Sequence, residues 1–259
     1  MWGPNAAGKT SLLEAIVLIA WGRSHRTSTD SELIRWGADV ARVDGRVQRP
    51  DGGTDPTDIE VALVMEGGGG QRKRIRVNGV PRRSTALAGI LRTVMFAPED
   101  MLLVAGPPGP RRTAIDTLAA SRSPAFTADL GTYGRALQQR NGLLRAIREG
   151  TAERDQLRFW DAALLEAGSA VVEGRLTALE ALAEPLRRSH AEIAPDEGRL
   201  TMRYATNAPP RPGETVRAAL TRRLAETADK EAWNGTTLIG PHRDDLVFEL
   251  EGRDLAGFA

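Results

Sequence analysis

The stretch GPNAAGKT at residues 3–10 decides the fold of this chain, and the apolar run that follows it supports the assignment. The stretch fits G-x-x-x-x-G-K-[S/T], a glycine-rich loop that surrounds the phosphates of a nucleoside triphosphate. The composition predicts about 0.004 matches by chance. The run at residues 10–19 predicts a helix, which such a loop needs because N–H groups and the positive end of the dipole then face the anion. A glycine-rich turn before an ordinary core helix is the alternative.

The loop assigns a chemical role to each part of the motif. Backbone N–H groups from Ala6 to Lys9 cradle phosphate oxygens, and Gly3 and Gly8 permit a tight backbone. Lys9 reaches the β- and γ-phosphates, and the hydroxyl of Thr10 ligates Mg²⁺. The predicted nucleotide-binding residues of this segment are Gly3, Pro4, Asn5, Ala6, Ala7, Gly8, Lys9, Thr10 and Ser11.

Composition limits the classes of protein to consider. The chain has 259 residues, 41% of them hydrophobic, and a net charge of +1, so no overall basic excess indicates a nucleic-acid partner. The absence of cysteine excludes disulfides, thiolate zinc sites and cysteine nucleophiles, and fits the cytoplasm. No apolar run approaches the roughly 18 residues of a membrane span, so no membrane partner is expected.

The pattern after the first helix changes to period two. Strands are predicted at 40–47, 59–65 and 73–77, with a tight turn at Asn78-Gly79. This order predicts an antiparallel meander after the phosphate loop rather than the parallel sheet of many phosphate-loop enzymes. Short helices at 31–36 and 84–91 and a short strand at 93–96 complete the segment.

The remainder of the chain is mainly helical in pattern. Helices fill residues 111–193 with breaks at Ser123-Pro124 and Gly150-Thr151, and another covers 214–229. Strands are predicted at 200–204, 236–239 and 246–250. The fold class is α/β, with three segments: residues 1–112 in a head that holds the phosphate loop and the meander, 113–232 in an inserted helical lobe, and 233–259 in return strands of the head.

Several further strings occur in an order that points to one family. They are the basic strand with the Asn78-Gly79 turn, the string Phe96-Ala97-Pro98-Glu99-Asp100, the Arg111-Arg112 pair, the segment from Tyr133 to Leu144, and Gly240-Pro241-His242-Arg243-Asp244-Asp245-Leu246. In this order and spacing the whole chain resembles the RecF family of bacterial replication and repair proteins.

The resemblance implies a fold and a function. The fold is a partial ATPase head of the ABC/SMC type, with an inserted helical lever lobe. The function is binding of ATP with Mg²⁺ and of double-stranded and gapped DNA. Family members act with RecR and RecO, indirectly help to place RecA at single-strand gaps, and in full-length form make an ATP-dependent homodimer.

The resemblance also implies that the family's N-terminal strands, signature segment and Walker B strand are missing from this chain. We therefore expect a fragment that folds poorly and has no ATPase activity of its own. A stand-alone phosphotransferase, such as a small-molecule kinase, is the alternative function. The antiparallel meander and the string at residues 240–246 disfavour it.

Two more sets of residues are candidates through the resemblance. Arg26 lies where SMC-type heads carry an arginine near the nucleotide, and a solvated loop arginine is the alternative. The candidate DNA contacts are Arg72, Lys73, Arg74, Arg76, Arg111 and Arg112, with Arg82 and Arg83 nearby; a solvated basic edge strand is the alternative. For His242 to Asp245, a family role at the head surface and a plain turn before a strand both stay open.

Overall fold

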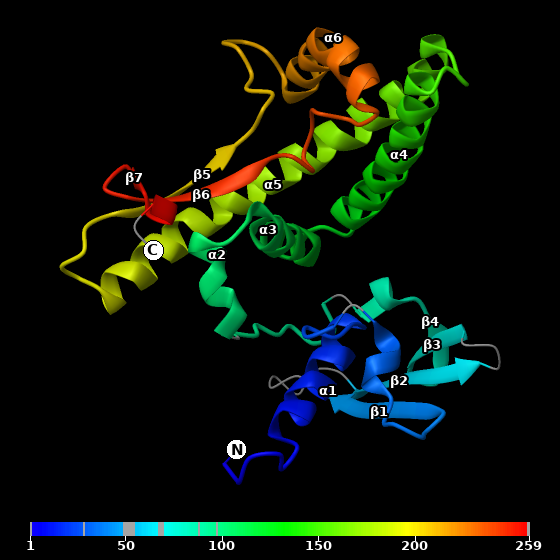
Figure 1. The fold of residues 1–259 in the computed structure, drawn as a ribbon. Helices are drawn as coiled ribbons and strands as arrows, with labels where there is room; N and C mark the ends of the chain where they lie inside the picture. Colours follow the sequence, from blue (N-terminus) through cyan, green and yellow to red (C-terminus); the bar gives the residue numbers. More distant parts are fainter. Residues whose placement is uncertain are drawn as a thin grey trace. The chain divides into compact units, whose positions relative to one another are not determined.

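The computed structural model describes residues 2–27, 29–48, 55–66, 70–87, 89–96 and 98–257, and it forms two compact units, residues 1–96 and 97–259 (Figure 1). The elements of the first unit are α1 (Lys9–Trp21), the 3-10 turn η1 (Asp30–Leu33), β1 (Val40–Val47), β2 (Thr57–Glu66), β3 (Gly70–Val77), β4 (Val80–Arg82) and the 3-10 turn η2 (Ser84–Leu87). The predicted meander is confirmed, since the four strands pair antiparallel in the order β1-β2-β3-β4.

One face of this sheet is apolar and the other is charged. Ile59, Val61 and Ile75 are buried on the inner face and pack against Leu18 and Ile19 of α1. Alternate residues face the opposite side, so the register places Arg42 of β1 in line with Arg74 of β3 on what we call the outer face. The turn at Asn78-Gly79 has positive φ at both residues, as a two-residue hairpin requires.

Gly45 fixes how closely α1 approaches the sheet. A Cβ atom at this position would collide with Cδ1 of Ile19, which is buried in the same core. The helix therefore lies against β1 at a distance that only glycine permits. This contact holds the C-terminal half of α1, while its first two turns carry the phosphate loop.

The second unit is mainly helical. Its elements are the 3-10 turn η3 (Pro98–Met101), α2 (Leu102–Ala105), α3 (Pro108–Arg122), α4 (Pro124–Arg148), the 3-10 turn η4 (Arg154–Gln156), α5 (Leu157–Ile193), β5 (Leu200–Ala205), α6 (Val216–Asn234), β6 (Asp245–Leu250), β7 (Arg253–Asp254) and the 3-10 turn η5 (Leu255–Gly257). The strands form an antiparallel sheet in the order β5-β6-β7. Among the described residues, none of the helices combines the length and apolar character that a bilayer crossing requires.

Two glycines let α4 and α5 pack closely. A Cβ on Gly174 would lie 2.5 Å from Cδ2 of Phe126, and a Cβ on Gly168 would lie 3.1 Å from Cε2 of Tyr133. Both aromatic rings are buried in one core with residues of α3, α5, α6 and β6. The predicted breaks between the helices are confirmed at Ser123, which caps α4, and at Gly150.

Two predicted strands are wrong, and two predicted short helices are 3-10 turns. Thr93–Phe96 has no ladder partner among the described residues, and Val94 is fully exposed. Thr236–Ile239 forms a loop, because Thr237 bonds to side chains instead of to a neighbouring strand. The compact units also divide at Phe96, before the predicted boundary at 112, and residues 233–257 belong to the second unit.

Candidate functional site

The phosphate loop wraps around the start of α1. Ala6 and Gly8 have positive φ, at 64° and 81°, and these two left-handed residues bend the chain into the helix. A Cβ on Gly8 would touch nothing within 4 Å, so its conformation and not a lack of space favours glycine. The first backbone bond of the helix joins the N–H of Leu12 to the carbonyl of Gly8 at 3.0 Å.

Lys9 spans this loop. Its ammonium donates to the carbonyl of Gly3 at 2.8 Å and to the carbonyl of Pro4 at 2.7 Å. No carboxylate pairs with Lys9 among the described residues, and the first turn of α1 contains no acid and no side-chain cap. Lysine charge and the positive end of an uncapped helix therefore converge on one loop, an arrangement that suits an anion.

Thr10 lies in the first helical turn and is exposed. Its hydroxyl is the one predicted magnesium ligand of the loop, and the described residues contain no cluster of three or more histidine or acidic side chains that could hold a metal. A magnesium ion here would take its other ligands from phosphate oxygens and water, as this ion commonly does.

Arg26 is held against α1 by Glu14, a residue that the sequence analysis missed. Glu14 accepts from the hydroxyl of Ser24 at 2.6 Å and pairs with the guanidinium of Arg26 at 3.5 Å. Glu14 follows Thr10 by four residues, so both lie on one face of α1. The contact with Glu14 therefore holds Arg26 on the face of α1 that also carries Thr10. An acid one turn beyond Thr10 in an otherwise apolar run was the signal available in the sequence.

The structure separates the four basic residues of β3. Arg72, Arg74 and Arg76 lie on the outer face, and Lys73 lies on the inner face. The ammonium of Lys73 donates to the carbonyl of Gly22 at 2.9 Å and pairs with Asp30 at 2.6 Å. Lys73 therefore ties the end of α1 to η1, which is a structural role.

The outer-face arginines differ in their partners. Arg76 lies 3.8 Å from Glu60, and Arg72 lies 4.0 Å from Glu66. Arg74 has no ion-pair partner among the described residues and stands opposite Ala62 in the sheet. It is the β3 arginine best placed to meet a phosphate.

Arg111 is part of the interior of the second unit, and Arg112 lies at its edge. Arg111 is 6% exposed; it makes a two-pronged pair with Asp245 and also donates to the carbonyls of Leu103, Val104 and Gly106. Arg112 is half-buried and donates to the carbonyl of Asp244 at 2.9 Å. These contacts leave Arg111 no free face for DNA.

Residues 240–246, which we call the 240–246 turn, are the centre of a buried polar network. Asp244 is 1% exposed, and burial raises the pKa of its carboxyl. His242 lies between the hydroxyl of Tyr133 and the carbonyl of Thr237, and burial, helped by nearby arginines, lowers its pKa to about 4. The histidine is neutral at physiological pH, so the turn acts as structural support and not as a proton carrier.

Two buried arginines anchor this network to the helices. Arg140 of α4 pairs with Asp161 and with the fully buried Glu231, and donates to Thr237. Arg175 of α5 pairs with Asp116 and donates to the carbonyl of Pro241. Arg140 lies within the string from Tyr133 to Leu144 that the sequence analysis singled out, and Arg175 lies in none of the strings. Neither burial was predictable, because burial of an arginine depends on the tertiary fold.

Known proteins resemble the first unit in one comparison and the whole chain in the others. The first 93 residues match a family described as "AAA domain". The DNA replication and repair protein RecF of Acidothermus cellulolyticus is 36% identical over 99% of this chain and 70% of its own length. The protein of the same name from Bacillus subtilis is 36% identical over 98% of this chain and 68% of its own length. A solved structure described as the recombination mediator protein RecF with ATP, in the RecFOR pathway, superposes on the present chain with a TM-score of 0.89 at 30% identity. The match covers 100% of the present chain and 68% of the chain in that structure.

Proposed function

The chain belongs to the RecF family and has the fold of its ATP-bound structures, and we propose on this premise that it is an ATP- and DNA-binding protein of replication and recombinational repair. The observation that carries the proposal is Lys9, whose ammonium sits inside a loop that ends at an uncapped helix and has no carboxylate partner among the described residues. Such a loop fits the β- and γ-phosphates of ATP, with Mg²⁺ on Thr10.

Arg26 is a second nucleotide contact in this proposal. Its guanidinium is more than half exposed and is held by Glu14 on the Thr10 side of α1. A positive group at that position favours the developing charge on a γ-phosphate.

DNA is the second ligand in the proposal. Arg74 offers an unpaired guanidinium on the outer face of the β-meander, and Arg72 and Arg76 flank it on weakly paired positions. Contacts of this kind go to the phosphate backbone and read no base sequence. Gapped duplex DNA is the expected substrate, and RecR and RecO are the expected protein partners. The expected outcome is loading of RecA, with an ATP-dependent homodimer as the active form in the cytoplasm.

A mobility-shift experiment tests the proposal. The protein is mixed with gapped duplex DNA, with and without ATP and Mg²⁺, beside the Lys9→Met variant. We expect ATP-dependent binding that Lys9→Met removes. A parallel screen for phosphorylation of small-molecule acceptors tests the kinase alternative, which neither the antiparallel sheet nor the family membership supports. Phosphorylation of an acceptor without any DNA binding would contradict the proposal and favour the kinase alternative.

A further inference from the structure

The 240–246 turn holds nearly all of its side chains inside the second unit. Pro241 is buried, and its carbonyl accepts from Arg175 at 2.7 Å. The ring of His242 bonds on one side to the hydroxyl of Tyr133 at 2.6 Å and on the other to the carbonyl of Thr237 at 3.2 Å. These contacts fix the first half of the turn.

The second half of the turn is fixed as firmly. Asp244 accepts from the hydroxyl of Tyr204 at 2.8 Å and from the N–H of Asn207 at 3.3 Å. Asp245 receives both prongs of Arg111 at 2.8 Å. A turn of this length with two carboxylates and a histidine locked in place is rigid, because each buried polar group would lose a partner if the turn moved.

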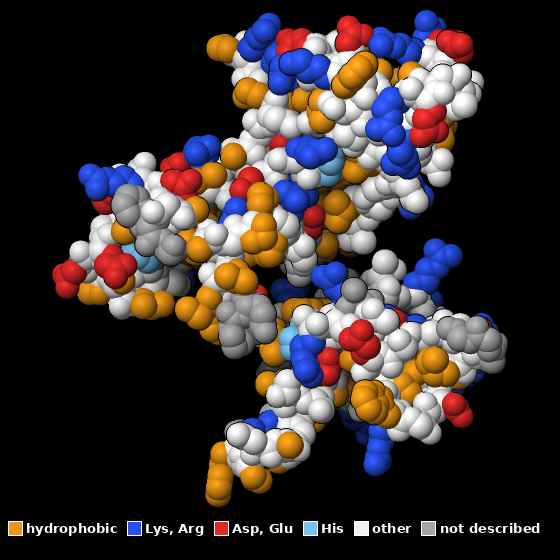
Figure 2. Space-filling view, viewed as in Figure 1, with side chains coloured by type: hydrophobic (Ala, Val, Ile, Leu, Met, Phe, Trp, Pro, Cys, Tyr) orange, Lys and Arg blue, Asp and Glu red, His pale blue; other side chains and the backbone are white. Residues whose placement is uncertain are grey.

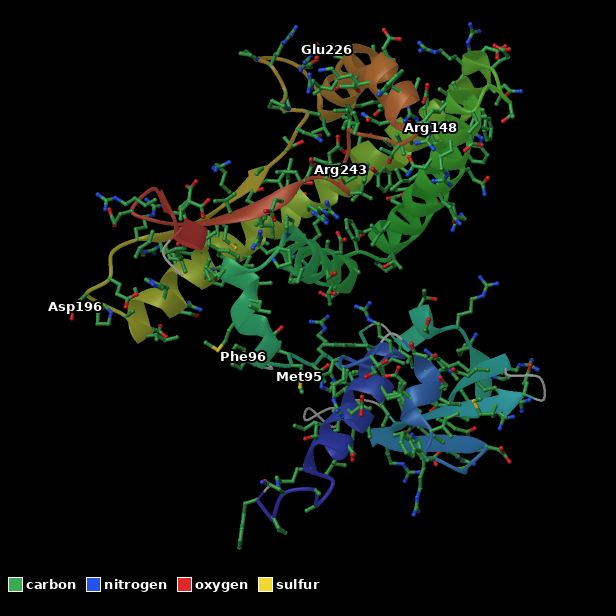
Figure 3. All side chains as sticks on the ribbon, viewed as in Figure 1. Met95, Phe96, Arg148, Asp196, Glu226 and Arg243 are labelled. Atoms are coloured by element: carbon green, nitrogen blue, oxygen red, sulfur yellow. The ribbon has the colours of Figure 1, made fainter. Side chains whose placement is uncertain are left out.

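Arg243 is the exception within the turn. It is exposed (labelled in Figure 3), and its backbone N–H closes the turn onto the carbonyl of Gly240 at 2.8 Å. Its guanidinium makes one long bond, 3.4 Å to the carbonyl of Thr237, and has no carboxylate partner among the described residues. Arg112 reaches the same turn through the carbonyl of Asp244 and likewise has no described carboxylate partner.

Some other exposed arginines of this unit are paired with carboxylates. Arg203 pairs with Glu249 at 2.8 Å, and Arg187 pairs with Glu184 at 2.6 Å. Figure 2 shows the general pattern, with acidic and basic side chains intermingled on the visible face. An arginine that stays unpaired on a rigid support is preorganised for an external anion, because less freedom is lost when the contact forms.

We propose that Arg243, with Arg112 at the same turn, is a contact site for a phosphate of the DNA backbone. The inference rests on the DNA-binding function proposed above and assigns a site to it in the second unit. A guanidinium suits this ligand, since it presents paired N–H groups to phosphate oxygens and keeps its charge at any physiological pH. The same group also suits the carboxylates of a protein partner, which the experiment distinguishes.

The experiment measures the affinity for a fluorescent duplex as salt is varied, using the whole protein. The variants are Arg243→Ala, Arg243→Lys and, as the matched control, Arg203→Ala, which removes an exposed arginine that is already paired. Loss of one phosphate contact lowers the log–log salt slope by about 0.9 and weakens binding roughly tenfold at 0.1 M salt. We expect this for Arg243→Ala, a smaller loss for Arg243→Lys, and none for Arg203→Ala.

Each outcome decides between the two claims. If the unaltered protein does not bind duplex DNA, the proposed function and this site are both wrong. If it binds and Arg243→Ala keeps the same slope with an unchanged melting temperature, the function stands and the site is wrong. Weakened binding of a protein partner with unchanged DNA binding would also overturn the site, because the anion would then be a carboxylate. If Arg243→Ala lowers the melting temperature, the comparison is made instead between Arg243→Lys, which keeps the charge, and Arg243→Gln, which removes it. The proposed site then requires a steeper salt slope of DNA binding for Arg243→Lys than for Arg243→Gln.

Discussion

Glu14 links α1, the helix after the phosphate loop, to the loop that carries Arg26. It bonds to Ser24 and pairs with Arg26, and Ser24 in turn accepts from the N–H groups of Arg26 and Thr27. Removing the carboxylate therefore frees the loop that carries Arg26, without touching the phosphate loop itself.

The first prediction concerns this coupling. Glu14→Ala and Arg26→Ala should each weaken ATP binding several-fold, and the double variant should be no weaker than Arg26→Ala alone, because Glu14 acts through Arg26. Titration of a slowly hydrolysed ATP analogue in the presence of Mg²⁺ measures all three. Additive losses would show that Glu14 affects the nucleotide by another route.

His242 gives the second prediction, which concerns pH and stability. Its pKa is about 4 in the folded chain, chiefly because of burial, against about 6.5 when unfolded. The unfolded chain therefore binds a proton first as pH falls. The contribution of His242 to the free energy of unfolding is therefore fully present above pH 6.5, and it falls by about 3 kcal/mol as pH falls to 4.

Comparison with a variant isolates this effect. Asp244, whose pKa is raised, titrates with the opposite sign, since its folded carboxyl takes up a proton before the unfolded one does. Denaturant unfolding of the unaltered protein and of His242→Gln between pH 4 and 7 gives the difference that belongs to His242. Parallel pH profiles for the two proteins would mean that the histidine is not buried as a neutral ring.

The loop and the helix after it were predictable because the motif fixes both spacing and residue type, whereas the nucleotide contacts of its residues stay predictions. The internal role of Arg111 was not predictable, because the same Arg-Arg string is equally consistent with a DNA contact and with an internal ion pair. Only the fold brings Asp245 to within 2.8 Å of Arg111, across 134 residues of sequence.

Among the elements, the α4–α5 pair depends on close approach at Gly174. The third prediction is that Gly174→Val destabilises the second unit by about 1–3 kcal/mol, because a side chain there meets the buried ring of Phe126. Gly134→Ala is the matched control, since this α4 glycine faces open space and alanine should stabilise the helix by about 0.5–1 kcal/mol. Equal melting temperatures for Gly174→Val and the unaltered protein would contradict the packing.

The outer face of the β-meander gives the fourth prediction. Arg74→Ala should lower the salt slope of duplex binding by about 0.9, while Arg46→Ala should not, because Arg46 is already paired with Asp58 at 2.6 Å. Fluorescence anisotropy over a range of salt concentrations measures both. A loss that is the same for the two variants would indicate a general charge effect and not a contact.

Strands with regular alternation were the most predictable elements. β1 begins at Val40 and ends at Val47, as the period-two pattern indicates, since one face of it is partly buried against the core that includes α1. The segment at Thr236–Ile239 has the same β-branched character yet forms a loop. The hydroxyl of Thr237 accepts a hydrogen bond from Arg140 and donates one to Asn141. These buried polar contacts outweigh the preference of the segment for a strand.

The whole molecule consists of two compact units with different features. The first holds the phosphate loop, α1 and the β-meander, and the second holds helices α2 to α6 and the 240–246 turn. Fold class and family followed from the sequence because several motifs recur in one order over the whole chain. The division at Phe96 did not, since it depends on contacts that no local pattern encodes.

The central claim is that the loop at residues 3–10 binds ATP through Lys9. The direct test is isothermal titration of the protein with a slowly hydrolysed ATP analogue and Mg²⁺, beside Lys9→Met and Lys230→Met. The chain has three lysines, and Lys230 is an exposed residue of α6, which makes it a matched control. The account predicts saturable binding that Lys9→Met weakens at least tenfold, because the β/γ contact is lost, and that Lys230→Met leaves unchanged. Equal affinity for Lys9→Met and the unaltered protein would contradict it.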